Sequence, residues 1–242
     1  MSARHFAQAF KKKTFTPIFK LNSYIFCKMV LDRVVNTIGG FCMKKCMIIL
    51  NPSSGKEQAL EYKDQMLKQL HNFDVVVKET KKEGDATQFA RLACDEQYDA
   101  VVLVGGDGTL NEGINGIAEQ PHRPIVGIVP LGTVNDFARA LKIPLEPAEA
   151  ITLLGGATRK EDIGKVNNHY FTNVIAIGSI ADAVGDVSVA QKTSLGSLAY
   201  LVEGVKAAVQ NESFEIQVEA NDTDYLEETM LFLCVLTDSV GS

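Results

Sequence analysis

Apolar runs and helical stripes alternate along residues 46–141. Consecutive apolar residues over 46–50 stop at Asn51 and Pro52, and proline cannot continue a central strand, so this run predicts a buried strand. Similar runs predict further strands over residues 73–77, 99–106 and 124–130. Apolar positions at three- and four-residue steps predict helices over residues 56–71, from Gly84 to about Ala93, 109–118 and 134–141. Strands that alternate with helices predict βαβ units and a parallel sheet.

The pattern changes after about residue 157. Strand-like segments over 160–165, 169–177, 214–220 and 229–237 now outnumber helices, and a single convincing helical stripe covers 197–210. We therefore predict an α/β domain over residues 43–157 and a partial, antiparallel β-sandwich domain over residues 158–242. Within the first domain, Asp85 is the expected N-cap of the helix that begins with the sequence GDAT.

Charge is unevenly distributed along the chain. The net charge is −6, but residues 1–42 carry seven basic residues and one acid, so that the other 200 residues carry about −12. A generally basic surface is thus excluded, and no nucleic-acid partner is expected. Residues 1–42 form a basic leader that we expect to be poorly ordered. It is either an extension upstream of a start at Met43 or a segment that contacts anionic lipid.

Targeting and metal-binding signals are weak. The leader lacks the apolar core of a signal peptide, and the sequence contains no apolar run of about 18 residues, so we predict a cytoplasmic protein. The five cysteines and four histidines show no ligand spacing. Reduced thiols are therefore expected.

Residues 101–116, VVLVGGDGTLNEGING, carry the most chemical information. A buried strand delivers Gly105, Gly106 and Gly108 at its carboxyl end, where ligands bind in open α/β sheets. Glycine leaves backbone N–H groups accessible to a phosphate, and the next helix directs its positive end toward it. Asp107 would act through Mg²⁺, through a substrate hydroxyl, or as a cap of the turn. A tight turn with a capping aspartate is the structural alternative.

Two other loops offer hydrogen-bonding groups. Residues 51–56, NPSSGK, provide the hydroxyls of Ser53 and Ser54 and the Gly55 amide, but they lack the Walker A spacing. In residues 130–141, PLGTVNDFARAL, a glycine precedes three polar residues at a helix start, which is more than capping requires. These residues are Thr133, Asn135 and Asp136. Thr80 and Thr87 flank GDAT and are candidates to bound a nucleotide pocket, or are ordinary caps.

The chain resembles the catalytic domain of the diacylglycerol kinase family, in particular its soluble bacterial lipid kinases, over roughly residues 44–242. The motifs that carry this resemblance are, in this order, NPSSGK, GDAT, GGDGTLNE and PLGTVNDFARAL. The GGDG motif alone is shared with NAD kinases and phosphofructokinases. The resemblance implies a nucleotide-binding α/β domain of that type joined to a β-sandwich. It also implies that ATP is held by Asn51, Pro52, Ser53, Ser54, Gly55, Thr80, Gly106, Asp107, Gly108, Thr109, Leu110, Asn111, Glu112 and Thr133.

The reaction that the resemblance implies is Mg²⁺-dependent transfer of the ATP γ-phosphoryl group to the hydroxyl of diacylglycerol, which gives phosphatidic acid. It further implies peripheral membrane contact and allows a homodimer. Asp107 is the candidate catalytic residue, and Thr87, Asn135 and Asp136 are secondary site candidates. Sphingosine, ceramide, phosphatidylglycerol and undecaprenol remain alternative acceptors, because the motifs recognise the nucleotide.

The sequence departs from the family pattern toward its end. The family's Mg²⁺-binding acids and its Asp-Gly-Glu-type motif with the proton acceptor do not occur before Ser242. We therefore expect an incomplete β-sandwich with an exposed edge, weak nucleotide binding and little kinase activity. A non-catalytic nucleotide- or lipid-binding fragment is the alternative from a different functional class.

Overall fold

The computed structural model describes residues 18–20, 44–55, 58–166, 168–178, 213–220, 223–229 and 231–236. These residues divide into two compact units, each described by itself below. The first unit contains residues 44–162. The second contains a short strand, β1 (Ile18–Lys20), and the residues from 163 onward.

A parallel sheet of four strands forms the centre of the first unit, as the apolar runs predicted. Its strands are β2 (Lys44–Leu50), β3 (Phe73–Glu79), β4 (Ala100–Gly105) and β5 (Ile125–Pro130). The order in the sheet is β3-β2-β4-β5, and every neighbouring pair is parallel. The chain therefore moves from β2 to one side and returns to β4 on the other side. In open α/β sheets such a switch point marks the crevice where ligands bind.

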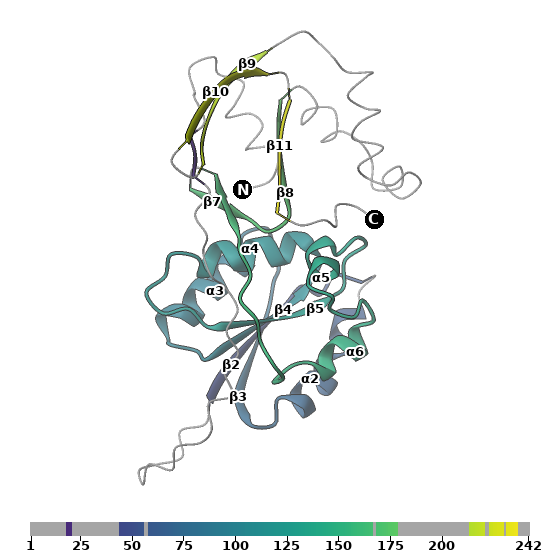
Figure 1. Cartoon of the computed structure of the whole chain (residues 1–242). Helices are drawn as coiled ribbons and strands as arrows, with labels where there is room; N and C mark the ends of the chain where they lie inside the picture. The colour runs from purple at the N-terminus through teal and green to yellow at the C-terminus, as the bar shows by residue number, and fades with distance from the viewer. Residues whose placement is uncertain are drawn as a thin grey trace. The chain divides into compact units, whose positions relative to one another are not determined.

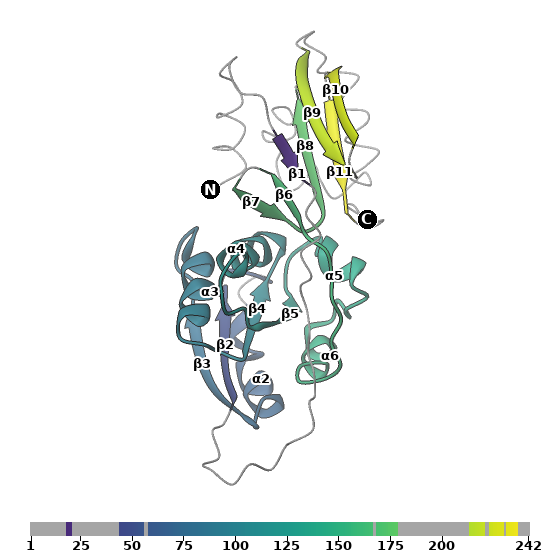
Figure 2. The same cartoon turned by 60° about the vertical axis from the view of Figure 1, so that its left-hand side comes forward.

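Helices cover both faces of this sheet (Figures 1 and 2). On one face lie α3 (Asp85–Asp95) and α4 (Asp107–Ile117). On the other lie α2 (Lys63–Gln69) and α6 (Pro147–Thr152), and α5 (Asp136–Ala140) follows β5. Gly116 allows α4 to pack closely against α3, because a Cβ atom there would lie 2.4 Å from the Thr87 carbonyl oxygen.

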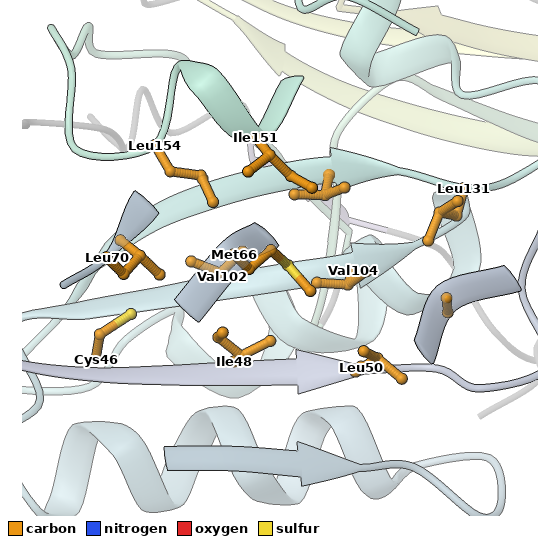
Figure 3. Close-up of a cluster of buried hydrophobic side chains, with 12 residues drawn as sticks. Cys46, Ile48, Leu50, Met66, Leu70, Val102, Val104, Leu131, Ile151 and Leu154 are labelled. Atoms are coloured by element: carbon orange, nitrogen blue, oxygen red, sulfur yellow. The ribbon is translucent and has the colours of Figure 1, made fainter. Parts of the chain in front are cut away.

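The main hydrophobic core lies between the sheet and helices α2 and α6 (Figure 3). Alternate residues of a strand point to the same face, so β2 and β4 each contribute every second side chain to this core. Each fully buried aliphatic side chain contributes roughly 1.5–3 kcal/mol to stability. The buried residues labelled in Figure 3 are Cys46, Ile48, Leu50, Met66, Leu70, Val102, Val104, Leu131, Ile151 and Leu154.

Three local predictions in this unit differ from the structure. The helix expected over 56–71 is instead a 3₁₀ turn, η1 (Gln58–Leu60), followed by α2; Ala59 is fully buried whereas Leu60 is 46% exposed, which interrupts the expected stripe. Asp85 is not the N-cap of α3, because Gly84 occupies that position and the Asp85 carboxylate binds the preceding loop. Helix α6, which was not predicted, is only six residues long.

The second unit is built from short strands that are mainly antiparallel. One sheet has the order β10-β9-β1-β6-β7, and β8 pairs with β11 in a second sheet. Buried Val166, Phe171 and Ile216 of the first sheet pack with Phe232 and Cys234 of the second. The strands after β1 are β6 (Gly164–Val166), β7 (His169–Phe171), β8 (Val174–Gly178), β9 (Phe214–Ala220), β10 (Thr223–Thr229) and β11 (Leu231–Val235). An antiparallel β region after the α/β part is thus confirmed.

Details of the second unit depart from the expected pattern. Strand β10 was not predicted, because its residues TDYLEET are largely polar. The segment expected as one strand over 169–177 is divided into β7 and β8. Within the leader, for which no ordered element was expected, β1 pairs with β6 and runs parallel to β9. The helix predicted over 197–210 and the rest of the leader lie outside the described residues.

Candidate functional site

Three loops that are far apart in sequence meet at the carboxyl edge of the four-stranded sheet. They follow β2, β4 and β5 and begin at Asn51, Gly106 and Leu131. The Asn51 N–H donates to the Val104 carbonyl (3.0 Å), and the Leu131 N–H donates to the Gly105 carbonyl (2.8 Å). Each loop is therefore bonded to the end of β4, where the switch point of the sheet lies.

Asn51 connects the first two loops through its side chain. Its Nδ2 donates to Oγ1 of Thr109 in the first turn of α4 (3.2 Å). Its Oδ1 accepts hydrogen bonds from the Ser53 N–H (3.1 Å) and the Ser53 hydroxyl (2.8 Å). Gly55 ends this loop with φ +63°, a conformation that favours glycine, and a Cβ atom there would lie 2.9 Å from Leu131 Cδ2. The loop after β2 thus contacts both of the others.

The loops after β4 and β5 touch through bare backbone. A Cβ atom at Gly106 would lie 3.0 Å from the Gly132 Cα, and one at Gly132 would lie 2.6 Å from the Gly106 Cα. Asn135, with φ 55° and 7% exposure, closes the second loop, because its Oδ1 accepts from the Gly132 N–H (2.8 Å) and its Nδ2 donates to the Gly132 carbonyl (2.7 Å). The Asn135 side chain therefore shapes this loop.

A pocket of about 320 Å³ opens where the loops after β2 and β3 meet α3 and α4. The polar groups that line it include the Asn51 amide and the hydroxyls of Ser53, Thr80 and Thr109. The Thr80 N–H donates to the Leu50 carbonyl (2.9 Å), which places the end of β3 beside the loop after β2. The described residues that line it are Asn51, Pro52, Ser53, Thr80, Lys81, Lys82, Glu83, Ala86, Thr109 and Glu112.

Helix α4 begins beside this pocket. Gly106 is its N-cap, Asp107 its first residue, and no side chain caps its end. The first N–H groups of an uncapped helix carry partial positive charge and bind anions. Gly108 lies in this first turn and is exposed, and a Cβ atom added there would meet no atom within 4 Å. The arrangement can therefore hold a phosphate against backbone amides.

Asp107 lies on the side of α4 that faces α5. Its Oδ1 accepts a long hydrogen bond from the Phe137 N–H (3.4 Å), and Phe137 belongs to the first turn of α5. It lines a small cavity of about 10 Å³ with Gly105, Pro130 and Asn135, and not the larger pocket. Asp107 thus connects the starts of α4 and α5, a contact that the sequence did not predict.

The loop between β3 and α3 is held by Asp85. Oδ2 of this 8% exposed residue accepts the N–H groups of Lys81 (2.8 Å) and Lys82 (3.1 Å). The hydrogen bond from the Lys81 N–H, more than any other contact, lowers the pKa of the Asp85 carboxyl below its usual value of 3.8; burial opposes this effect. Asp85 is therefore a loop anchor that remains charged at neutral pH.

The structure brings together part of the set that the sequence predicted. Six of its members line the 320 Å³ pocket: Asn51, Pro52, Ser53, Thr80, Thr109 and Glu112. The other members lie in the same loops or in α4 without lining it, namely Ser54, Gly55, Gly106, Asp107, Gly108, Leu110, Asn111 and Thr133. Leu110 is buried at 5% exposure.

Thr87, a secondary candidate, donates its hydroxyl to the Glu112 carbonyl (2.9 Å) and joins α3 to α4. Asp136, another secondary candidate, is the first residue of α5. Sequence reasoning missed Lys81, Lys82, Glu83 and Ala86. The sequence did offer a signal for the two lysines, because they directly follow Thr80, which was already a candidate site residue.

Within the described ranges, no group of three or more His, Cys, Asp or Glu side chains is arranged to hold a metal ion. None of the helices in this part of the chain is both long and apolar enough to cross a bilayer.

The fold is an α/β fold in which loops meet at a switch point beside a glycine-rich turn and the start of a helix, an arrangement in which α/β proteins bind ligands. The family model described as diacylglycerol kinase catalytic domain matches residues 45–166. The chain belongs to the diacylglycerol kinase catalytic domain family.

Relatives and solved structures agree with this family. A diacylglycerol kinase of Staphylococcus epidermidis is 40% identical over 201 residues, which are 82% of this chain and 64% of that protein. A diacylglycerol kinase of Bacillus subtilis is 39% identical over 203 residues, or 82% of this chain and 67% of that protein. A crystal structure of a diacylglycerol kinase from Bacillus anthracis superimposes with a TM-score of 0.64 at 27% identity, covering 82% of this chain and 66% of that one. The chain thus spans about two thirds of each of these proteins.

Proposed function

We propose that this chain carries the nucleotide site of an ATP- and Mg²⁺-dependent lipid kinase, which transfers the γ-phosphoryl group of ATP to the hydroxyl of diacylglycerol and gives phosphatidic acid. The observation that carries the proposal is the polar pocket of about 320 Å³ beside the glycine-rich turn, in a chain of this family. The proposed division is an α/β domain over residues 43–157 and a β domain over 158–242. The proposed setting is the cytoplasm, with peripheral membrane contact and a homodimer as the proposed assembly.

In this proposal the phosphates of ATP lie over the first turn of α4. The N–H groups of Gly106, Asp107 and Gly108 bind them, and the Thr109 hydroxyl, which already accepts from Asn51, adds a donor. The hydroxyls of Ser53 and Thr80 complete the lining. Phosphoryl transfer depends mainly on in-line positioning and on neutralisation of charge, and groups already fixed by hydrogen bonds need little reorganisation.

Mg²⁺ fits these residues as a companion of the nucleotide. Protein sites hold Mg²⁺ through one or two carboxylates together with substrate phosphates, so a cluster of three acids is not required. Glu112 lines the pocket, whereas Asp107, earlier in α4, faces α5. We assign Glu112 as the carboxylate that contacts the metal–nucleotide complex. When bound, Mg²⁺ neutralises charge on the phosphates.

Asp107 is the proposed catalytic carboxylate among the described residues. Its Oδ1 is placed at the junction of α4 and α5, directly beside the glycine turn that would hold the phosphates. A carboxylate in that position can accept the proton of an attacking lipid hydroxyl or orient that hydroxyl. Asp136, at the start of α5, is the second candidate.

Gly108→Ala tests the nucleotide site without disturbing the fold. No protein atom would contact the added methyl group, and alanine is favoured over glycine within a helix by up to about 1 kcal/mol, so stability should be unchanged or higher. The methyl group would obstruct a phosphate at this backbone, so we expect roughly tenfold weaker MgATP binding by isothermal titration calorimetry. Gln88→Ala, on the exposed side of α3, is the control. Equal MgATP affinity in wild type and Gly108→Ala, or no binding to either, would overturn the proposal.

The lipid acceptor requires a separate assay on the full chain. Radiolabelled ATP is incubated with detergent micelles that contain diacylglycerol, sphingosine, ceramide, phosphatidylglycerol or undecaprenol. Slow transfer, to diacylglycerol more than to the other lipids, is expected. Transfer to a different lipid alcohol alone would replace the proposed acceptor, and phosphorylation of NAD without any response to lipid would indicate an NAD kinase. Intact MgATP binding with no transfer would favour a non-catalytic nucleotide-binding protein.

A further inference from the structure

The loop over residues 80–84, between β3 and α3, brings two positive charges to the pocket. Lys81 and Lys82 are exposed and line it, together with Thr109 and Glu112 of α4. This loop starts at a fixed point, because the Thr80 N–H donates to the Leu50 carbonyl (2.9 Å). Neither lysine is part of the glycine-rich turn or of the loop after β2.

Asp85 determines which groups of this loop can reach a ligand. Its Oδ2 accepts both lysine N–H groups, at 2.8 and 3.1 Å, and its own N–H donates to the Lys82 carbonyl (3.3 Å). The backbone amides of Lys81 and Lys82 are therefore bonded within the loop. The groups that remain for an anion in the pocket are the two side-chain ammonium groups.

Charge balance shows why an anion would need them. Two glutamates, Glu83 and Glu112, line the same pocket and offset the two lysines. Outside the leader, the chain carries about −12, so its overall field repels a polyphosphate. A nucleotide triphosphate adds several negative charges to this site. Local positive charge therefore favours binding of the phosphates, and among the described residues that line the pocket Lys81 and Lys82 are the ones that provide it.

We propose that Lys81 and Lys82 bind the polyphosphate tail of the nucleotide and make the pocket select nucleoside di- and triphosphates over nucleosides, and that Asp85 is the positioning residue that holds the two lysines at the pocket wall. This inference rests on the proposed nucleotide site and deepens it. The lysines supply selectivity for phosphate number, whereas the amides of α4 and the hydroxyls bind one phosphate closely.

The main test compares ligands that differ only in phosphate number. ATP, ADP, AMP and adenosine are titrated by competition with a fluorescent ATP analogue, with wild type, Lys81→Ala/Lys82→Ala and the charge-conserving Lys81→Arg/Lys82→Arg. Since the lysines are exposed, we expect the alanine pair to weaken ATP binding roughly three- to tenfold at low salt. Adenosine binding should not change, the arginine pair should retain affinity for ATP, and the loss should shrink as salt is raised. Lys68→Ala, on the exposed side of α2, is the matched control.

Asp85→Asn tests the positioning role. The amide keeps one acceptor oxygen but loses the charge, so the loop should be held less firmly, and ATP affinity should fall by a smaller factor than in the alanine pair. In the alanine-pair background, Asp85→Asn should have little additional effect on ATP affinity, because the groups that it positions are gone. Full additivity would overturn the positioning role.

Three outcomes separate this inference from the proposed function. If wild type binds ATP and the alanine pair binds it equally well, the lysine assignment is overturned while the nucleotide site stands. If the alanine pair loses ATP and adenosine binding to the same extent, the lysines act on pocket shape and the assignment is again overturned. If wild type binds none of the four ligands, the proposed function itself fails.

Discussion

The two edges of the same parallel sheet use their polar groups in different ways. At the amino edge, the Lys45 N–H donates to Asp99 Oδ2 (2.8 Å), and the Lys45 ammonium lies 5.7 Å from the centre of the Tyr98 ring. The His122 Nε2 donates to the Tyr98 carbonyl (2.7 Å). Burial of the Cys46 side chain raises the pKa of its thiol to about 12, and the charge of Asp99 adds to this increase to a smaller extent. Large side chains fill this edge.

At the carboxyl edge, the loops that follow these strands and the start of α4 carry small residues. Asn51, Ser53 and Thr109 bond to one another, and Gly106 and Gly132 meet through bare backbone. Both edges are well bonded, and among the described residues the pocket of about 320 Å³ lies at the carboxyl edge. The comparison shows that one sheet carries large side chains at one edge and short polar side chains with bare backbone at the other.

Tyr98→Ala should have the largest effect on stability. Tyr98 is 6% exposed, and truncation of a buried aromatic side chain typically lowers the free energy of unfolding by about 3 kcal/mol or more. Because the change lies at the amino edge, MgATP affinity of the folded protein should stay within a factor of about two. Urea unfolding and calorimetric titration measure the two quantities. A large loss of affinity in the folded variant would show that the edges are coupled.

Gly132→Ala should act on both quantities, with a smaller loss of stability. The added Cβ atom would lie 2.6 Å from the Gly106 Cα and 2.7 Å from the Asn135 Oδ1, so the backbones must separate. Such overpacking costs about 2 kcal/mol. Displacement of the glycine turn should weaken MgATP binding by roughly tenfold. Unchanged stability together with unchanged affinity would contradict the contact between these loops.

The smallest effect is expected in the pH dependence of stability. The pKa of Asp85 is lower in the folded chain than its usual value of 3.8, so its stabilising contribution is present above that value and is lost as the pH falls through the folded pKa. Between about pH 5 and pH 3, the unfolding free energy of wild type should therefore fall more steeply than that of Asp85→Asn. Chemical unfolding at each pH measures this slope, with Asp64→Asn in α2 as control. Parallel slopes in wild type and Asp85→Asn would contradict the loop anchor.

The sequence predicted those elements that depend on local pattern. Strands β2 and β4 were found because their apolar runs are continuous, as buried parallel strands require. The stripe of α3 was found because Ala86, Ala90 and Ala93 recur at helical spacing, and all three are buried. Short or polar elements such as α6 and β10 gave too little signal.

The errors in the site have a common physical origin. Asp85 was expected to cap its own helix, but its carboxylate accepts hydrogen bonds from two N–H groups of the preceding loop. An aspartate at a helix start can bind N–H groups on either side of it, and the sequence does not show which side it binds. Lys81 and Lys82 were not predicted, because they line the pocket with the loop after β2 only when β3 lies beside β2 in the sheet. Sequence spacing does not contain that neighbour relation.

By itself, the sequence determined the parallel sheet, the glycine-rich turn after β4 and the family to which its motifs point. These features follow from hydrophobic period, backbone freedom and residue type, which act over a few neighbouring positions. Only the tertiary structure decided that Asn51 would bond to Thr109, 58 positions away, and that a lysine pair would form a pocket wall. The reason is that the order of strands in the sheet, set by packing of the whole core, determines which loops become neighbours.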